Sequence, residues 1–451
     1  MNRRLRIGRH VTAWAAVIAL AVCVSACSTV WPAYHGNAAR TGDDRIDRGL
    51  LPIKHAWGAR LDGAVYGQPL VWSGRVLAAT ENDTVYALDG HDGRVLWSRH
   101  LGSPMRNVIA QAGCGNIDPL GITSTAVIDT ATHTIFVVAT MQDANKVIHH
   151  QLVGLDVATG VVRVSANADP GGVQNPLHIQ QRAALALSKG RVYVGYGGYA
   201  GDCGVYHGWL VSRTEAGAAK LAFDVTPHTG QGAIWAPGGP AVDATGNVYI
   251  ATGNPNPVVS AGDYGESLLE FDPALHLLHH FSASNATDDQ DLGSVGPALL
   301  GSKLVFQIGK QHVGYLLETT DLSKLQSIKV CSGEAFGGTA FDGKHLYVPC
   351  QEHIREVNIN ATARSMSLGW AGPTTSSAGP PILAGGVLWS IDTADAKLYA
   401  LNPSTGKTMT TMTLAGVPHF ASPSAALGLL LIGTNTGVTA LDGPSGPPPH
   451  A

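Results

Sequence analysis

One short pattern recurs along this chain and restricts its fold more than any other feature of the sequence. Its clearest copy spans residues 85–97, where apolar and polar residues alternate on both sides of His91-Asp92-Gly93. This predicts two strands joined by a tight turn. Further copies lie at residues 152–160, 267–273, 356–360, 398–406 and 438–443, and each follows another hairpin pattern. Four strands per unit, repeated every roughly 40 to 60 residues, are typical of a β-propeller.

The number of units and the two ends of the array predict how the ring closes. Units begin near Gly67, Gly121, Gln181, Gly238, Gly296, Gly337, Gly379 and Ser422. Residues 54–61 match only the outer strand of a unit, because Trp57 has the place of Trp97 in the repeat, and the last unit, 421–443, lacks an outer strand. We therefore predict an all-β, eight-bladed propeller of four-stranded antiparallel blades over residues 54–443. An N-terminal strand completes its last blade and closes the ring.

The N-terminus has the pattern of an export signal. Arginines precede an apolar stretch at residues 11–24, which is short for a bilayer span and ends in small residues. Val24-Ser25-Ala26-Cys27 resembles the lipobox of bacterial lipoproteins, which implies a lipid on Cys27; the alternative is an ordinary signal peptide with a chance cysteine. We expect a signal peptide at 1–26, a lipidated N-terminus and linker at 27–53, and a disordered proline-rich tail at 444–451. The protein is then exported and held by its lipid at the outer face of the cell membrane, or in the periplasm of a Gram-negative cell.

Composition and cysteine content agree with an exported all-β protein. Charged residues make up 14% of the chain, and a net charge of -4 offers no basic surface for nucleic acid. Four cysteines lie beyond the signal and lipid positions: Cys114, Cys203, Cys331 and Cys350. An even number in an oxidising compartment favours disulfides, with three possible connectivities. We favour Cys114–Cys203 and Cys331–Cys350, and free buried thiols remain the alternative.

The repeat, the eight units and the segment that begins at Trp31 resemble propellers of the pyrroloquinoline quinone (PQQ) type. That group includes alcohol dehydrogenases that bind PQQ and Ca²⁺. It also includes propellers without a cofactor, such as the lipoprotein of the Gram-negative outer-membrane assembly machine. The resemblance covers nearly the whole chain after the signal, and it implies a fold more firmly than a function.

Three local matches to the dehydrogenases imply a metal site. Residues 252–257 resemble the segment whose Asn binds Ca²⁺, residues 288–291 resemble the acidic segment that ends in the catalytic base, and Asp202 falls where those enzymes have a Ca²⁺-binding Glu. The resemblance therefore implies Asp202, Asn254 and Asp291 as metal ligands and Asp291 as the catalytic base. Each has a structural alternative: Asn254 caps a turn, Asp291 accepts backbone hydrogen bonds, and Asp202 is solvated.

Four further residues are candidates for contact with a cofactor. Trp235 is placed to stack on a quinone from below. Lys310 and His312 are candidates for the cation beside the quinone oxygens. Arg182 belongs to Gln181-Arg182-Ala183-Ala184-Leu185, which resembles a signature of a less described group of exported PQQ-like propellers.

The chain also departs from the dehydrogenases. It has the single Cys114 where they carry two adjacent cysteines, and Gln290 replaces a tryptophan. On these departures we favour a cell-envelope lipoprotein whose propeller binds an envelope protein or a small ligand and needs no cofactor. The alternative is a dehydrogenase of alcohols or sugars that uses PQQ and Ca²⁺. Convergence of Asp202, Asn254 and Asp291 near the axis, with Trp235 and a cation beside them, would favour the enzyme.

Overall fold

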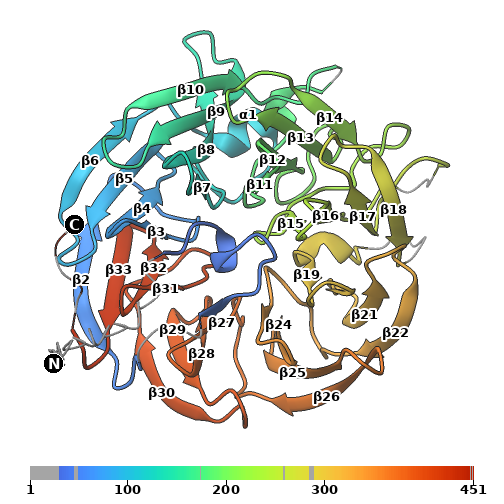
Figure 1. The fold of residues 1–451 in the computed structure, drawn as a ribbon. Helices are drawn as coiled ribbons and strands as arrows, with labels where there is room; N and C mark the ends of the chain where they lie inside the picture. Colours follow the sequence, from blue (N-terminus) through green and yellow to red (C-terminus); the bar gives the residue numbers. More distant parts are fainter. Residues whose placement is uncertain are drawn as a thin grey trace, which may run out of the picture.

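The computed structural model describes residues 30–44, 49–172, 174–256, 260–283 and 289–446, together with Pro448 and His450. Eight sheets surround a central axis like the blades of a propeller (Figure 1). This confirms the predicted all-β, eight-bladed propeller. The predicted signal peptide, the lipidation site Cys27 and parts of the tail lie outside the described residues.

Each blade contains four antiparallel strands, numbered outward from the axis except where noted. Blades one and two contain β3 (Leu70–Trp72), β4 (Arg75–Ala79), β5 (Thr84–Asp89), β6 (Val95–His100), β7 (Val127–Asp129), β8 (Thr134–Gln142), β9 (Ile148–Asp156) and β10 (Val162–Asn167). Blades three and four contain β11 (Ala186–Ser188), β12 (Arg191–Tyr196), β13 (Trp209–Thr214), β14 (Leu221–Asp224), β15 (Ala241–Val242), β16 (Val248–Ala251), β17 (Ser267–Phe271) and β18 (Leu277–Ser282).

The second half of the ring follows the same plan. Blades five and six contain β19 (Ala298–Leu299), β20 (Leu304–Gln307), β21 (Val313–Glu318), β22 (Lys324–Lys329), β23 (Ala340–Phe341), β24 (His345–Cys350), β25 (His353–Asn360) and β26 (Ser365–Ala371). Blades seven and eight contain β27 (Ile382–Ala384), β28 (Val387–Asp392), β29 (Lys397–Leu401), β30 (Thr408–Thr413), β31 (Ser424–Ala426), β32 (Leu429–Thr434), β33 (Gly437–Asp442) and, outermost, β2 (Lys54–Arg60). Short helical turns are η1 (Tyr34–Gly36), α1 (Val108–Ala112), η2 (Pro176–His178) and η3 (Leu292–Ser294). No helix in the described part of the chain is long and apolar enough to cross a membrane.

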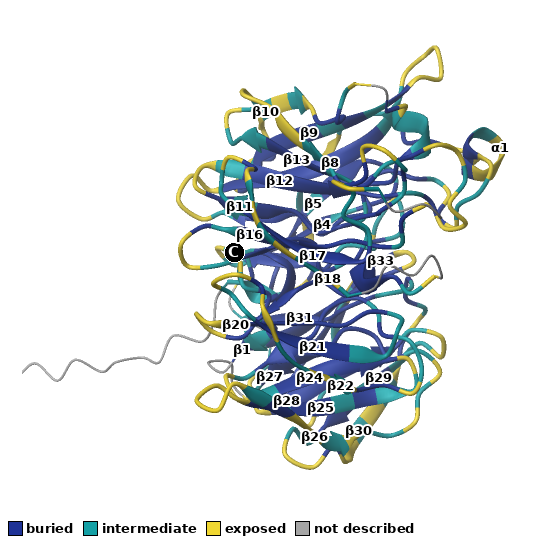
Figure 2. Cartoon of the chain, turned by 90° about the vertical axis from the view of Figure 1, so that its right-hand side faces the viewer, coloured by how far each residue is buried: buried dark blue, intermediate teal, exposed yellow. Residues whose placement is uncertain are grey.

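The strands are buried according to their distance from the axis. All six residues of β32 are buried, whereas intermediate and exposed residues alternate along β18. Figure 2 shows the buried strands in the interior of the ring and the exposed loops at its faces and rim. Inner strands are covered by neighbouring blades on both faces, so they need apolar residues throughout. The outer strands have one solvated face, which explains why their alternation is visible in the sequence.

Tryptophans of three outer strands join neighbouring blades. The indole Nε1 of Trp97 in β6 donates to the carbonyl of Val157, 2.9 Å away, in the next blade. A Cβ on Gly160, whose φ is +68°, would lie 2.5 Å from the Trp97 ring. The turn glycine of the repeat is therefore required both by its backbone conformation and by the ring packed on it. Trp57 and Trp370 make equivalent contacts with Gly93 and Gly406.

The ring closes where the two ends of the array meet. Strand β2 pairs with β33, with Trp57 opposite Ala440 and Gly58 opposite Thr439. This confirms that an N-terminal strand completes the last blade. The outer strand of blade eight therefore comes from the opposite end of the chain and covers the edge that β33 would otherwise expose.

Residues 31–44, which we call the plug, cross one end of the axis, although the sequence predicted a linker here. The turn η1 lies near the centre of the ring (Figure 1), and β1 (Asp43–Asp44) pairs in parallel with β27. Arg40 is buried and donates to the carbonyls of Pro240, Tyr34 and Leu185. Backbone carbonyls therefore satisfy this arginine, and the plug ties together blades that are far apart in the sequence.

Candidate functional site

A cavity of about 420 Å³ near the axis brings together residues from several blades. Six of the candidate residues line it: Arg182, Asp202, Trp235, Asn254, Asp291 and Lys310. The structure places His312 outside this lining, because its Nδ1 contacts the carbonyl of Gly333. We call this space the axial cavity.

Two kinds of loop build the axial cavity. Asp202, Asn254 and Lys310 lie in loops between the second and third strands of blades three, four and five. Arg182, Trp235 and Asp291 lie in crossovers that lead from one blade to the innermost strand of the next. The plug instead packs beside turns between first and second strands, such as Gly301 and Gly343. Those turns are at the other ends of the strands, so the plug and the axial cavity occupy opposite faces of the ring.

Asp291 is the most enclosed acid of the cavity, with a side chain 8% exposed. Its Oδ1 accepts hydrogen bonds from the Trp235 indole at 3.3 Å and from the Asn254 backbone N–H at 3.2 Å. Its Oδ2 lies 2.7 Å from Lys310 Nζ. Asp291 has a left-handed backbone with φ of +34°, which is uncommon for a residue with a side chain and is found at functional sites.

Lys310 joins two acids of the same crossover. Its Nζ also lies 2.7 Å from Asp289 Oδ1, and 5.7 Å from the centre of the Trp235 ring. Burial alone would lower the pKa of Lys310, but the charge of Asp291 and the hydrogen bonds to Asp289 and Asp291 outweigh it and raise that pKa. Burial raises the pKa of Asp291 against the opposing charge of Lys310. The three groups form a compact charged cluster on one side of the cavity, which we call the Lys310 cluster.

A buried carboxyl lies behind this cluster. Glu266 is fully buried, and its Oε2 accepts a hydrogen bond of 2.7 Å from the Leu292 N–H. Its Oε1 has no hydrogen-bond partner among the described residues. Burial, aided by the charges of Asp291 and Asp289, raises the pKa of Glu266 to about 7. The sequence contained Glu266 beside Asp263-Tyr264-Gly265, but nothing in the pattern indicated its position behind Asp291.

A disulfide holds the loop that carries Asp202. Cys203 is bonded to Cys114, across 89 residues of sequence, and the Cys203 N–H also points to Cys114 Sγ. Tyr206 donates from its hydroxyl to Asp202 Oδ1 at 2.6 Å. Burial and the adjacent Asp202 charge raise the pKa of Tyr206, so its hydroxyl stays a donor. Asp202 itself is exposed at the mouth of the cavity.

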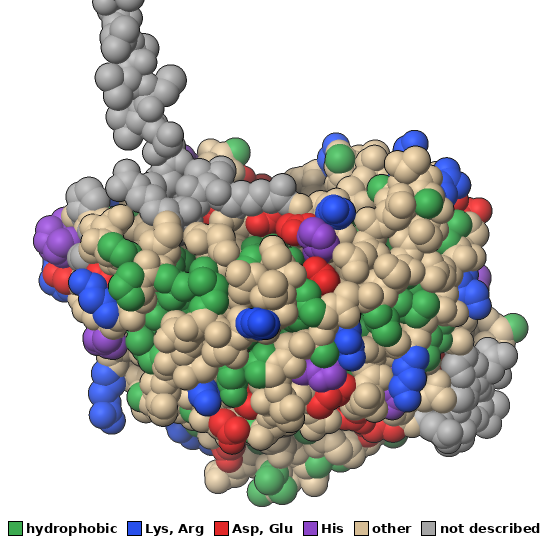
Figure 3. Space-filling view, turned by 90° about the horizontal axis from the view of Figure 1, so that it is seen from below, with side chains coloured by type: hydrophobic (Ala, Val, Ile, Leu, Met, Phe, Trp, Pro, Cys, Tyr) green, Lys and Arg blue, Asp and Glu red, His purple; other side chains and the backbone are tan. Residues whose placement is uncertain are grey.

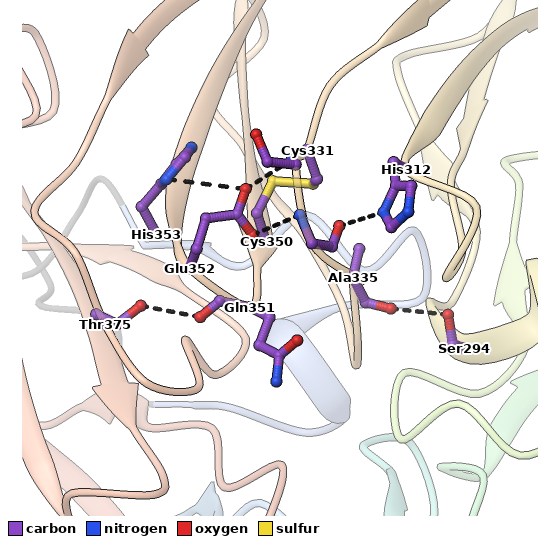
Figure 4. The surroundings of a disulfide bond; sticks show 11 residues. Ser294, His312, Cys331, Ala335, Cys350, Gln351, Glu352, His353 and Thr375 are labelled. Atoms are coloured by element: carbon purple, nitrogen blue, oxygen red, sulfur yellow. Dashed lines mark hydrogen bonds and ion pairs between the residues drawn. A yellow bond between two sulfur atoms is a disulfide. The ribbon is translucent and has the colours of Figure 1, made fainter.

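The second disulfide, Cys331–Cys350, holds the crossover that brings Glu334 and Phe336 to the cavity (Figure 4). Backbone N–H groups of Ser332 and Gly333 donate to the Glu352 carboxylate. The carbonyl of Ala335 accepts from Ser294, which lies in η3 just after Asp291. Both disulfides favoured by the sequence are thus present, and each supports a loop of the axial cavity.

Three aromatic rings line the cavity together. The Trp235 ring centre lies 6.3 Å from Phe336 and 6.1 Å from Phe420, and the two phenylalanines are 5.5 Å apart. The guanidinium carbon of Arg182 lies 5.6 Å from the centre of the Phe420 ring. Such a surface suits a flat, conjugated ligand. Neither phenylalanine was singled out in the sequence, because each is a single aromatic residue in an irregular crossover.

The donor types in the cavity fit a hard divalent cation, but they are not all free. Asp202, Asn254 and Asp291 supply carboxylate and amide oxygens of the kind that Ca²⁺ prefers. Asp291, however, is already neutralised by Lys310. In the described part of the chain, Asp89, Asp92 and His450 form a group of possible metal ligands within 4.8 Å of one another, outside the axial cavity. The similar group of Cys350, Glu352 and His353 also lies outside it, and its cysteine is held in a disulfide. A cation would therefore share Asp291 with Lys310.

Comparisons with known proteins agree with this architecture. Residues 54–201 match the family model described as outer membrane protein assembly factor BamB. The quinohemoprotein alcohol dehydrogenase of Comamonas testosteroni is similar in structure, with a TM-score of 0.72, 16% identity, and coverage of 93% of this chain and 81% of that one. The chain has a PQQ-like propeller fold.

Two other solved structures extend this similarity. A europium-containing methanol dehydrogenase has a TM-score of 0.69 and 16% identity, covering 91% of this chain and 90% of its own. BamB from Moraxella catarrhalis has a TM-score of 0.58 and 14% identity, covering 86% and 99%. No curated protein matches the chain in sequence. At these identities the comparisons support the PQQ-like fold, which alcohol dehydrogenases and an assembly factor share, so the function has to be argued from the site.

Proposed function

We propose that the axial cavity binds a planar quinone of the PQQ class beside a divalent cation, and that the protein oxidises an alcohol or sugar there. The observation that carries this proposal is the convergence of Asp202, Asn254, Asp291, Trp235 and Lys310 on one cavity. These residues come from three successive blades, and they are the ones for which the resemblance to PQQ dehydrogenases implies a role. This reverses the preference that the departures from those enzymes favoured.

The residues of the cavity divide the work between binding and proton transfer. Asp202, Asn254 and Asp291 would hold the cation, and Trp235 offers its ring to the quinone. When bound, such a quinone accepts two electrons from the substrate. Asp291 is placed to take the proton of the substrate hydroxyl at its carboxylate, because burial raises its pKa while Lys310 keeps it ionised. Phe336 and Phe420 exclude water from the same space.

The experiment that tests the proposal combines binding with turnover. Chelator-treated protein is titrated with PQQ in a calorimeter, with and without Ca²⁺, and dye-linked alcohol oxidation is measured on the same sample. We expect Ca²⁺-dependent binding, and a loss of rate of about a hundredfold or more in Asp291→Asn. Asp272→Asn, in an exposed turn between β17 and β18, is the control and should keep full activity. Tight binding without dye reduction would leave a ligand-binding pocket and remove the enzyme.

A second candidate function is an envelope scaffold, which is supported by the match of residues 54–201 to the BamB model. The scaffold would use an exposed surface of the ring. On the side shown in Figure 3, hydrophobic side chains are interspersed with polar and charged ones. If neither PQQ nor Ca²⁺ binds, site-specific crosslinking from the loops of blades one to three in intact cells becomes the deciding experiment.

Both candidates place the protein outside the cytoplasm. Two disulfides that hold functional loops are typical of proteins in an oxidising compartment. We further propose that Cys27 carries a lipid that attaches the propeller to a membrane face. Incorporation of labelled palmitate by the native chain, and its loss in Cys27→Ser, tests that attachment.

A further inference from the structure

Arg182 is a cation of the axial cavity that has no acidic partner in the part of the chain that the structure describes. Its side chain is half-buried, and its guanidinium lies over Phe420 at 5.6 Å. Within the described residues, its hydrogen bond runs from Nη2 to Asn116 Oδ1 at 3.2 Å, and no carboxylate lies within 4.0 Å. A guanidinium has five N–H donors in a fixed fork, so most of its binding capacity is unused.

Two other enclosed cations near the axis, Arg40 and Lys310, are satisfied by the protein. Arg40 donates from all three of its nitrogens to backbone carbonyls. Lys310 contacts two carboxylates at 2.7 Å. Removing a charge from water is costly unless a partner of opposite charge replaces the water. Arg182 is the exception among these three, and it faces a space large enough for a ligand.

The surroundings of Arg182 provide no competing acid at contact distance. Glu81 is the carboxyl whose charge reaches Arg182; its Oε2 accepts from the Gly121 N–H and the Thr123 hydroxyl, and its Oε1 has no hydrogen-bond partner among the described residues. Burial lowers the pKa of Arg182 to about 10 and, with help from the Arg182 charge, lowers that of neighbouring His419 to about 4. His419 is therefore neutral near pH 7, and its buried Nε2 has no hydrogen-bond partner among the described residues. Arg182 and His419 both line a smaller space of about 20 Å³ that adjoins Phe420.

We infer that Arg182 binds a carboxylate of the ligand, so that the axial cavity selects a flat organic acid lying against Phe420 and Phe336. The inference rests on the proposed function in placing the ligand in this cavity. A carboxylate matches the guanidinium fork in two parallel hydrogen bonds. A phosphate suits the site less, because it is tetrahedral and offers no flat face to the Trp235, Phe336 and Phe420 rings.

The test compares acids with their neutral esters. The purified full chain is titrated with PQQ and PQQ trimethyl ester in the presence of Ca²⁺, and with quinoline-2,4-dicarboxylate and its dimethyl ester, while tryptophan fluorescence is recorded. We expect each acid to bind at least about tenfold more tightly than its ester, and Arg182→Gln to weaken acid binding about thirtyfold or more without weakening ester binding. The affinity of Arg182→Lys for the acids should lie between those of the native protein and Arg182→Gln, because lysine keeps the charge but lacks the two parallel N–H donors of the guanidinium. Arg213→Gln, at the rim of blade three, is the control and should bind like the native protein.

The outcomes separate this inference from the proposed function. Ca²⁺-dependent PQQ binding that is unchanged in Arg182→Gln overturns the inference and keeps the function. Binding of quinoline-2,4-dicarboxylate that depends on Arg182, without PQQ binding, keeps the inference and removes the function. Equal affinity of acids and esters in the native protein also overturns the inference.

Stability of the ligand-free protein supplies a second readout that needs no ligand. If Arg182 is uncompensated until an anion binds, its charge does not stabilise the ligand-free protein. Arg182→Met should then leave the melting temperature unchanged or raise it. Arg40→Met, which removes three hydrogen bonds to carbonyls, should lower it. A melting temperature that falls as far in Arg182→Met as in Arg40→Met would assign Arg182 a structural role and overturn the inference.

Discussion

Lys310 and Arg182 are two cations of one cavity in opposite electrostatic situations. Lys310 lies between Asp289 and Asp291, so its positive charge is compensated within the protein and the cluster keeps an excess of negative charge. Arg182 lies on Phe420 with one hydrogen bond to Asn116. The comparison teaches that the protein supplies acidic partners for one cation of its site and leaves the other cation to a ligand. A compensated cluster fixes geometry, whereas an uncompensated charge provides selectivity.

The largest expected effect comes from removing the disulfide on the Arg182 side of the cavity. Cys114→Ser with Cys203→Ser opens a loop of 89 residues and should lower the free energy of unfolding by about 4 kcal/mol. Because Asn116 and Asp202 lie close to these cysteines, the preference for acids over esters should weaken as well. Denaturant unfolding and fluorescence titration check both.

The control for this experiment is the shorter disulfide. Cys331→Ser with Cys350→Ser opens 19 residues and should cost less, about 3 kcal/mol. This variant should disturb Glu334 and Phe336 while leaving Arg182 and Asn116 in place. Equal loss of acid selection in both variants would contradict the division of the cavity into two halves.

The next effect breaks the compensated half. Lys310→Met leaves Asp289 and Asp291 together without their cation, and should lower the free energy of unfolding by about 3 kcal/mol at pH 7. The double variant Lys310→Met with Asp291→Asn should recover most of this loss, since it removes an uncompensated charge. Arg364→Met, which breaks the exposed pair with Glu318, serves as the control and should cost no more than about 0.5 kcal/mol. If Lys310→Met and Arg364→Met lowered the free energy of unfolding by similar amounts, the Lys310 cluster would be no stronger than a surface ion pair.

A pH-dependent effect concerns the carboxyl behind the Lys310 cluster. The pKa of Glu266 is raised to about 7, so the unfolded chain loses this proton at lower pH than the folded protein does. The ionisation of Glu266 therefore lowers the free energy of unfolding progressively as the pH rises from about 4.5 to 7. Above pH 7 this loss is complete. Glu266→Gln should stabilise the protein by about 2 kcal/mol at pH 8 and have little effect at pH 4.

Glu352 provides a control for the pH dependence of stability, because its pKa is shifted in the opposite direction from that of Glu266. Burial opposes its ionisation, but hydrogen bonds from backbone N–H groups outweigh it and lower the pKa of Glu352. Its stabilising contribution is present above the unfolded pKa and is lost as the pH falls, so Glu352→Gln should destabilise the protein more at pH 8 than at low pH. The free energy of unfolding of both variants is measured between pH 4 and pH 8. If Glu266→Gln and Glu352→Gln changed it with pH in the same direction, the opposite pKa shifts assigned to Glu266 and Glu352 would be wrong.

The smallest effect concerns the ring that touches both halves. Trp235→Phe keeps an aromatic surface but removes the indole hydrogen bond to Asp291, and should cost about 1 kcal/mol. Binding of the quinoline acid should persist, because Phe420 and Phe336 remain. Loss of acid binding in Trp235→Phe would place the ligand on the Lys310 side of the cavity rather than beside Arg182.

The sequence by itself determined the blades and the closure of the ring. The features that predicted them are short-range: the residue pattern of β5, the turn at Gly93 and the tryptophan at position 97. Each acts within one blade or between neighbouring blades. The missing outer strand of the last unit and the extra strand at Trp57 predicted their pairing for the same reason. Six of the seven candidate residues for metal, cofactor or catalysis also line the axial cavity, because loops at equivalent places of successive blades must face the axis.

Only the tertiary structure decided which groups compensate one another. Nothing local in the sequence indicated that Phe336 and Phe420 meet beside Trp235 or that Glu266 lies behind Asp291. Nor did it indicate that, among the described residues, Lys310 has two acidic partners and Arg182 has none. The plug likewise has no repeat pattern, yet its Arg40 binds carbonyls of distant blades. Periodicity reports short-range packing, whereas burial and charge compensation depend on contacts that arise when the ring closes and brings distant crossovers to one axis.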